Sequence, residues 1–126
     1  MQAFLLVGAG GALGAMGRYG VGTLVGRVWH GGLPLGTLAV NIVGSLAMGL
    51  LVGFLARYTP EWQAQARLFL AIGLFGGFTT FSAFSLDAVI LIERGQFGLA
   101  FVYALASVVL SVLALFIGLI VMRGGV

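Results

Sequence analysis

The sequence predicts an all-α integral membrane protein whose protomer has four spanning helices, the third of them broken. Three observations predict this fold. The 126-residue chain is 61% hydrophobic and only 7% charged, whereas soluble domains carry about 25% charged residues. Its mean hydropathy is +1.19, which leaves too little polar surface for a water-soluble domain. A spanning helix needs about 20 apolar residues, so the chain accommodates four spans in a single membrane domain, 1–126.

The expected spans cover residues 3–28, 35–55, 68–92 and 97–122. Three short connections, polar or containing glycine or proline as chain reversals require, join them at 29–34, 57–62 and 93–96. Trp29, Tyr58 and Trp62 fall at the expected membrane interfaces, where amphipathic rings settle. Four spans place both termini on the same side of the membrane.

The third span departs most from an ordinary lipid-facing helix. Gly76 and Gly77 are closely followed by Thr79 and Thr80, and these residue types are poor in a helix interior. In hydrocarbon, a freed backbone group is tolerated only where it is buried in protein or lines a wet cavity. We therefore expect broken backbone from Gly76 to Thr79 that builds a site. Its free carbonyl oxygens suit a hard cation such as Na⁺.

Glycines at helical spacing indicate close packing between the spans. The chain has 22 glycines, and an i, i+4 spacing of small residues lets helix backbones approach. Three pairs have this spacing: Gly10/Gly14, Gly22/Gly26 and Gly49/Gly53. So small a bundle can scarcely enclose both a pore and its own core, which favours an oligomer, most often a two-fold dimer.

The arginines give no clear orientation in the membrane. The side that holds the termini carries Arg57, Arg67 and Arg123, and the opposite side carries Arg27 and Arg94. Three against two is nearly no bias under the positive-inside rule. Insertion in both orientations, with head-to-tail pairing, would give this near tie, and so would chance in a small count. The scattered arginines form no basic stripe, so nucleic acid is not an expected partner.

Two polar side chains lie within the first two spans. Arg18 marks a functional site by default, because a charge in the membrane is costly, although an arginine near a helix end can also snorkel. Asn41 lies well inside the second span, one turn from Thr37 and Ser45. It either serves a site or makes an ordinary interhelical hydrogen bond.

The third and fourth spans each carry a repeating pattern. Tyr103, Ser107 and Ser111 are four residues apart and therefore share one face, as a polar track would, although a single serine usually bonds its own helix. Phe81 and Phe84 are one turn apart. They either pack together or present ring edges, which carry partial positive charge, to a small anion.

No enzyme is visible in this sequence. The chain has no cysteine and a single histidine, His30, in a connection, so it lacks the partners for a catalytic set or a side-chain metal site. No span carries a carboxylate pair for a proton relay. Asp87 lies toward the end of the third span and fits a vestibule or interface position better than a catalytic one.

Three motifs follow one another along the chain: GGALGAMGRY at residues 10–19, GTLAVN at 36–41 and GLFGGFTTFSAF at 73–84. Together they resemble the GGxxGAxxRY, GTLxVN and GxxGGxTTFSTF signatures of the CrcB/Fluc family of fluoride channels. The likeness covers essentially the whole chain, and the order of the motifs is highly specific. Ala83 departs from the pattern, which usually has Thr there, and this leaves one polar contact in doubt.

The resemblance implies an antiparallel, dual-topology homodimer in the plasma membrane (the bacterial inner membrane), which lets F⁻ leave the cell passively. It implies a structural Na⁺ held by the backbone carbonyls of Gly76 and Thr79 from both subunits, and Arg18 in a vestibule. It implies a fluoride pore lined by Asn41, Thr80, Phe81, Ser82, Phe84, Tyr103, Ser107 and Ser111. The alternative is a small four-span, dual-topology, H⁺-coupled transporter, which would require an ionisable carboxylate in mid-membrane.

Overall fold

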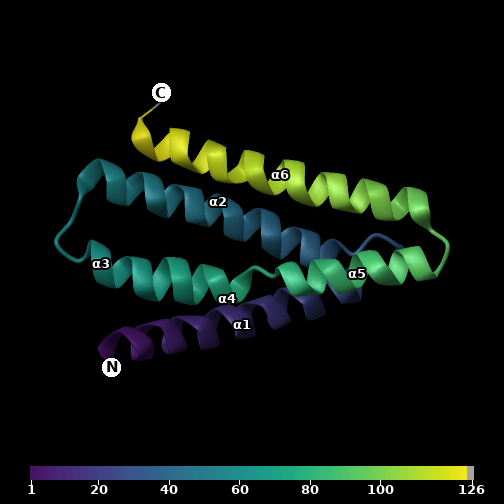
Figure 1. The fold of residues 1–126 in the computed structure, drawn as a ribbon, viewed down its shortest axis with the longest axis horizontal. Helices are drawn as coiled ribbons and strands as arrows, with labels where there is room; N and C mark the ends of the chain where they lie inside the picture. The colour runs from purple at the N-terminus through teal and green to yellow at the C-terminus, as the bar shows by residue number, and fades with distance from the viewer. Residues whose placement is uncertain (125–126) are drawn as a thin grey trace.

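The computed structural model describes residues 1–124, and these form helices joined by short loops (Figure 1). In chain order the elements are α1 (Gln2–Val28), α2 (Leu35–Tyr58), α3 (Gln63–Ala66), the π-helix η1 (Arg67–Phe75), α4 (Gly76–Phe78), α5 (Phe81–Glu93) and α6 (Phe97–Arg123). Four segments are long and apolar enough to cross a membrane: Gln2–Val28, Leu35–Tyr58, Gln63–Glu93 and Phe97–Arg123. The prediction of an all-α protein with four membrane-spanning segments is confirmed.

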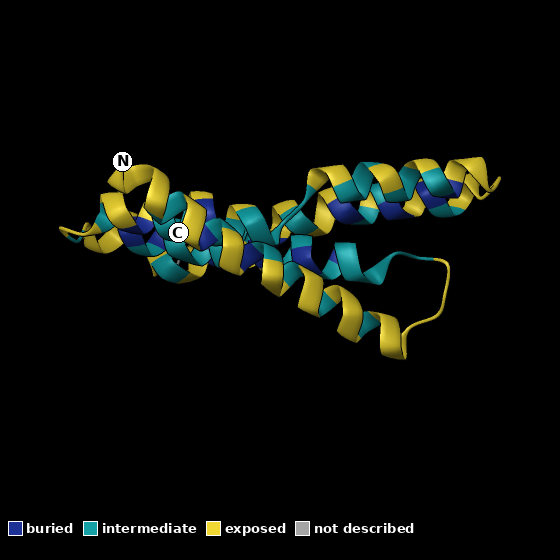
Figure 2. Ribbon diagram, turned by 90° about the horizontal axis from the view of Figure 1, so that it is seen from below, coloured by how far each residue is buried: buried dark blue, intermediate teal, exposed yellow. Residues whose placement is uncertain are grey.

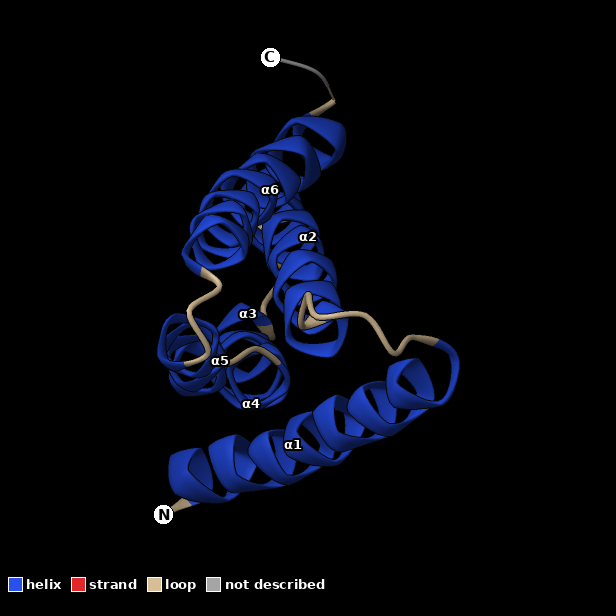
Figure 3. Cartoon of the chain, turned by 90° about the vertical axis from the view of Figure 1, so that its right-hand side faces the viewer, coloured by secondary structure: helices blue, strands red, loops and turns tan. Residues whose placement is uncertain are grey.

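The four segments pack as two pairs. Helix α2 packs mainly against α6, whereas α1 packs mainly against η1 and α4. Viewed along the bundle, α1 lies beside the segment from α3 to α5, and α2 and α6 lie together on the other side of that segment (Figure 3). Both termini lie at the same end of the bundle (Figure 1), as the four-span prediction requires.

The third spanning segment is regular on both sides of two extended residues. Helical backbone runs from Gln63 through Phe78, and α5 begins at Phe81. Between them, Thr79 has φ −85° and ψ 161°, and Thr80 has φ −156° and ψ 122°. The non-helical residues are therefore the two threonines, whereas we expected irregular backbone from Gly76 to Thr79. Gly76 belongs to α4.

Glycines allow the closest helix contacts, as predicted for two of the three pairs. A Cβ atom on Gly10 or Gly14 would collide with the backbone of the third segment near Leu74. On the other pair of helices, a Cβ atom on Gly49 would lie 2.9 Å from the Leu115 carbonyl carbon, and one on Gly53 would lie 2.9 Å from Met122 Cβ. Small residues therefore set the spacing within both helix pairs.

The third pair, Gly22 and Gly26, is packed less closely than the other two within the protomer. A Cβ atom on either residue would meet nothing within 4 Å, and both residues are exposed on α1. Their helical spacing is the same as that of Gly10 and Gly14. The difference is that α2 approaches this part of α1 only at Gly36, where an added Cβ would lie 3.4 Å from the Gly22 Cα atom.

The protomer has a small interior and a large apolar surface. Its largest fully buried side chains are Tyr103, Leu55, Leu91 and Val40. Buried positions form narrow stripes, while exposed positions cover much of each helix (Figure 2). In the most apolar windows of the four spanning segments, the buried share ranges only from 6% to 33%. The remaining apolar surface must face lipid or another chain, because water would not solvate it favourably.

Replacement of Gly49 with alanine should destabilise the protein by about 1–3 kcal/mol, the usual cost of an overpacked contact. The added methyl group must push α2 away from the Leu115 backbone, which is not a flexible side chain. Reversible unfolding in mixed detergent micelles measures the effect. Gly98→Ala is the matched control, since a Cβ there meets nothing within 4 Å. Equal stability of the two variants would contradict the packing argument.

Candidate functional site

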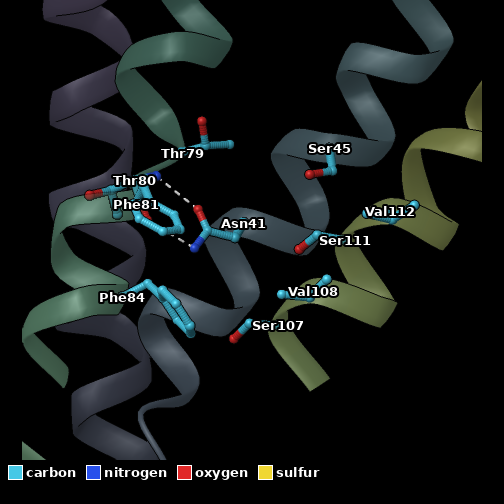
Figure 4. Close-up of a pocket in the computed structure, with 10 residues that line it drawn as sticks. All are labelled: Asn41, Ser45, Thr79, Thr80, Phe81, Phe84, Ser107, Val108, Ser111 and Val112. Atoms are coloured by element: carbon cyan, nitrogen blue, oxygen red, sulfur yellow. Dashed lines mark hydrogen bonds between the residues drawn. The ribbon is translucent and has the colours of Figure 1, made fainter. Parts of the chain in front are cut away.

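A cavity of about 330 Å³ lies beside the two extended threonines, and we call it the track cavity (Figure 4). It is lined by Asn41, Ser45, Thr79, Thr80, Phe81, Phe84, Ser107, Val108, Ser111 and Val112. These residues come from α2, α5, α6 and the connection between α4 and α5. The lining contains hydroxyls, one amide, aromatic rings and two valines, but no charged side chain. The track cavity is therefore polar along one wall and electrically neutral.

The side chain of Asn41 holds the extended backbone of Thr80 in place. The Thr80 N–H donates to Asn41 Oδ1 at 2.8 Å, and Asn41 Nδ2 donates to the Thr80 carbonyl at 3.0 Å. One amide thus pairs both backbone groups of a residue that has left the helix. Because an unpaired backbone group is costly in a membrane, Asn41 stabilises the connection. The sequence left a site role and an interhelical hydrogen bond open for Asn41; the structure shows the interhelical bond at the wall of the cavity.

The threonines also terminate the two helices locally. Thr79 donates from both its N–H and its hydroxyl to the Phe75 carbonyl, at 3.0 and 2.9 Å. The Thr80 hydroxyl accepts from the Ala83 N–H at 3.1 Å and so forms the N-cap of α5. At helix ends, threonine hydroxyls commonly form hydrogen bonds with backbone groups that lack a partner within the helix. The change of direction at residues 79–80 therefore follows from local hydroxyl chemistry and from Asn41.

Two buried hydroxyls on α6 face the cavity without a partner. The oxygens of Ser107 and Ser111 are buried and have no hydrogen-bond partner among the described residues. Both point toward the side of the cavity where the Phe81 and Phe84 rings lie (Figure 4). Buried hydroxyls normally find a partner. An unpaired pair of this kind at a cavity wall is suited to bind water or an anion that accepts hydrogen bonds.

Three aromatic rings form a continuous row. The ring centroids of Phe81 and Phe84 are 5.5 Å apart, and those of Phe84 and Tyr103 are 5.2 Å apart, with tilted planes in both pairs. Tyr103 is fully buried, whereas Phe81 is 78% exposed. The Tyr103 hydroxyl donates to Asp87 Oδ2 at 3.1 Å. The row thus runs from the protomer surface into the core and ends at a carboxylate.

Arg18 lies in a second cavity of about 270 Å³, which we call the Arg18 cavity. Its Nε atom donates to the Gly77 carbonyl at 3.3 Å, where the C-terminal end of a helix attracts a cation. Thr80 and Ala83 also line this cavity. Thr80 is common to both cavities, so the extended connection separates the neutral track cavity from a cavity that contains a positive charge.

The structure brings together most, but not all, of the residues predicted for one pore. Of the eight, Asn41, Thr80, Phe81, Phe84, Ser107 and Ser111 line the track cavity. Tyr103 shares the helix face of the two serines but is packed beneath Phe84. Ser82 is exposed and lies 3.3 Å from the Thr80 hydroxyl, outside either cavity. Sequence reasoning did not assign Ser45, Val108 or Val112 to the site, although Ser45 could have been found as the residue one turn beyond Asn41.

The two residues expected to supply metal ligands, Gly76 and Thr79, have different surroundings. Thr79 lines the track cavity, whereas Gly76 is exposed on α4. Within residues 1–124, no cluster of three or more His, Cys, Asp or Glu side chains could hold a metal ion. The carbonyl oxygens at the end of α4 are hard donors on the negative end of a helix, and they suit an alkali-metal ion better than a transition metal.

Comparison with known proteins finds one family and many similar sequences. The family model for CrcB-like protein, Camphor Resistance (CrcB), matches residues 5–119. The chain is 53% identical over 123 residues to the fluoride-specific ion channel FluC of Phenylobacterium zucineum, with 98% of this chain and 97% of that protein covered. It is 55% identical over 119 residues to the protein of the same name from Hyphomonas neptunium, with 94% of each chain covered.

Replacement of Asn41 with alanine should destabilise the fold, because Thr80 N–H and C=O would both lose their partner. Each buried group left unpaired costs about 1–3 kcal/mol. Detergent unfolding measures the loss, and Ser85→Ala is the control, since the Ser85 hydroxyl donates only to the Phe81 carbonyl of its own helix. If Asn41→Ala is as stable as Ser85→Ala, the amide does not hold the connection.

Proposed function

The chain belongs to the CrcB family, a family of channels rather than enzymes, and from this premise we propose that it conducts fluoride passively across the plasma membrane. Fluoride enters a cell as neutral HF and dissociates there, which traps the anion. A pore that lets F⁻ leave down its electrochemical gradient relieves this accumulation without energy coupling. Export would then be electrogenic, because each ion carries one negative charge.

The observation that carries this proposal is the pair of unpartnered hydroxyls on α6. The hydroxyl oxygens of Ser107 and Ser111 are buried, both residues line one cavity, and neither oxygen has a partner among residues 1–124. A hydroxyl can donate one hydrogen bond to an anion, and such charge-assisted bonds are about twice as strong as neutral ones. Fluoride is the halide that accepts hydrogen bonds most strongly, so two adjacent donors compensate best for the water that fluoride loses.

The neutral lining favours selectivity by hydrogen bonding rather than by charge. A cationic side chain would attract chloride as well as fluoride, but no such side chain lines the track cavity. The rings of Phe81 and Phe84 stand opposite the serines (Figure 4). An edge of either ring could contact the anion with its partial positive charge. Arg18 would raise the local anion concentration from its own cavity, on the other side of Thr80.

We infer that the working channel is an antiparallel homodimer. Phe81 is 78% exposed, so the track cavity is open on one side in a single protomer. Gly22 and Gly26 have the spacing of a helix-packing pair, but a Cβ atom on either would meet nothing within 4 Å, so α1 has open space on this face. A second copy would account for both observations. The near tie in arginines between the two sides of the membrane fits insertion in both orientations.

A structural Na⁺ fits the carbonyl groups at the connection. The Gly76 carbonyl belongs to the first residue of α4 and the Thr79 carbonyl to the extended segment that follows this helix, and Na⁺ prefers such hard oxygen donors. One chain supplies only these two oxygens, and the same carbonyls of a second copy would complete the set. In this proposal the ion holds two connections together, and it takes no part in conduction.

The alternative function, an H⁺-coupled transporter, needs a carboxylate that can take up a proton along the ion path. The track cavity has none. Asp87 is the nearest candidate, and its Oδ2 already accepts the Tyr103 hydroxyl. Direct measurement of the coupling between fluoride movement and protons separates the two functions.

Fluoride loaded into liposomes that contain the purified protein should leave rapidly when valinomycin carries K⁺ across the bilayer and so balances the charge, with no imposed pH gradient. A fluoride electrode follows the release. Phe81→Ile should slow it sharply, because isoleucine retains bulk but has no ring edge. Release that requires a proton gradient would support the transporter instead, and a Phe81→Ile protein with normal release would remove Phe81 from the pathway.

The protein should be a dimer in mild detergent, and the dimer should weaken when Na⁺ is replaced by N-methylglucamine. The large organic cation cannot reach a set of backbone carbonyls. Light scattering coupled to size-exclusion chromatography gives the mass in each buffer. A monomer in both buffers would contradict the dimer, and a dimer with equal thermal stability in both buffers would contradict the sodium site alone.

A further inference from the structure

The serine and threonine hydroxyls of this protein differ in whether the protein itself satisfies them. Thr23, Thr79 and Ser85 each donate to a backbone carbonyl in the preceding turn, at 2.9–3.0 Å, the usual solution for a hydroxyl in a membrane helix. Ser107, Ser111 and Ser45 make none of the side-chain hydrogen bonds found among residues 1–124. These three serines line the track cavity, whereas Thr37, which also makes none of these bonds, lines the Arg18 cavity.

The polar face of α6 ends at Ser111. The next residue at the same spacing is Leu115, whose backbone packs against Gly49 of α2. Gly49 lies one helical turn beyond Ser45 on α2. Helices α2 and α6 therefore close on each other just past the two serines, and a hydrated or partly hydrated ion cannot continue between them. Any path along the serines of α6 has to leave α6 at this level.

Ser45 lies at that closed end. Figure 4 shows it on α2, next to Ser111 and on the far side of Ser111 from Ser107, with Thr79 across the cavity. The Thr79 hydroxyl is already donated to the Phe75 carbonyl, and the Asn41 amide is paired with Thr80. Of the polar side chains of α2 at this end, Ser45 is thus the one whose hydroxyl makes no hydrogen bond with the described residues.

We propose that Ser45 is a third hydroxyl donor to the ion, which takes over a fluoride ion from Ser111 where the polar face of α6 ends. The Ser45 and Ser111 hydroxyls would donate to the same anion and form a subsite built from two helices. This assignment rests on the proposed fluoride conduction, and it makes Ser45 a determinant of affinity at the closed end of the cavity.

The test compares single-channel or macroscopic fluoride currents of Ser45→Ala and Ser85→Ala proteins in planar bilayers over a range of fluoride concentrations. Ser45→Ala should reduce current at subsaturating fluoride about tenfold and raise the half-saturating concentration, since one hydrogen bond to an ion is lost. Ser85→Ala removes a hydroxyl that is satisfied within its own helix and should behave as wild type. Ser45→Cys retains volume with a weaker donor, so its current should be intermediate.

Each outcome decides between support and rejection. The order wild type, Ser45→Cys, Ser45→Ala with unchanged detergent stability would support ion contact, because a role in helix packing would change stability without this order. If both Ser45 variants conduct fluoride as the wild-type protein does, the assignment of Ser45 is overturned, whereas the proposed fluoride conduction stands. Absence of fluoride current from the wild-type protein would overturn the proposed function and the Ser45 subsite with it.

Discussion

The pairing of the Asn41 amide with the backbone of Thr80 is the constraint on which the rest of the site depends. A chain that leaves a helix inside a membrane exposes an N–H and a C=O group that lipid cannot satisfy. A single amide on α2 satisfies both groups at 2.8 and 3.0 Å. This bond fixes the level at which α4 ends and α5 begins, and it ties the third spanning segment to the α2–α6 pair.

The two sides of this connection have different electrostatic character. The track cavity, on the side of α6, is lined by hydroxyls, one amide and aromatic rings but no charge, whereas Arg18 lies in the cavity on the side of α1. In the proposed channel, a charge placed next to the path, and not in it, would let a positive potential attract anions while short hydrogen bonds discriminate among them. Bound tightly by a fixed cation, an anion would leave slowly, and conduction requires weak, repeated binding.

Close packing through glycine explains how so short a chain provides these surfaces. Gly49 and Gly118 bring α2 and α6 together, and Gly10 and Gly14 bring α1 against the third segment. Because these contacts are made by backbone atoms and not by large side chains, few side chains are needed to form a buried core. Most of the remaining side chains are free to face lipid, a second copy or the ion path.

The composition and apolar periodicity of the chain were sufficient to predict four spanning helices, because the cost of burying polar groups in lipid acts on each segment independently. The hydroxyl spacing on α6 likewise placed Ser107 and Ser111 on one face. Only the tertiary structure decided that Thr79 and Thr80 are the non-helical residues, since that depends on Asn41, 39 positions before Thr80 in the chain. It also decided that Tyr103 donates a hydrogen bond to Asp87, that a Cβ on Gly22 or Gly26 would meet open space, and that Ser45 and Ser111 line one cavity. Each of these outcomes depends on how two helices approach, and a pattern within one helix contains no information about that distance.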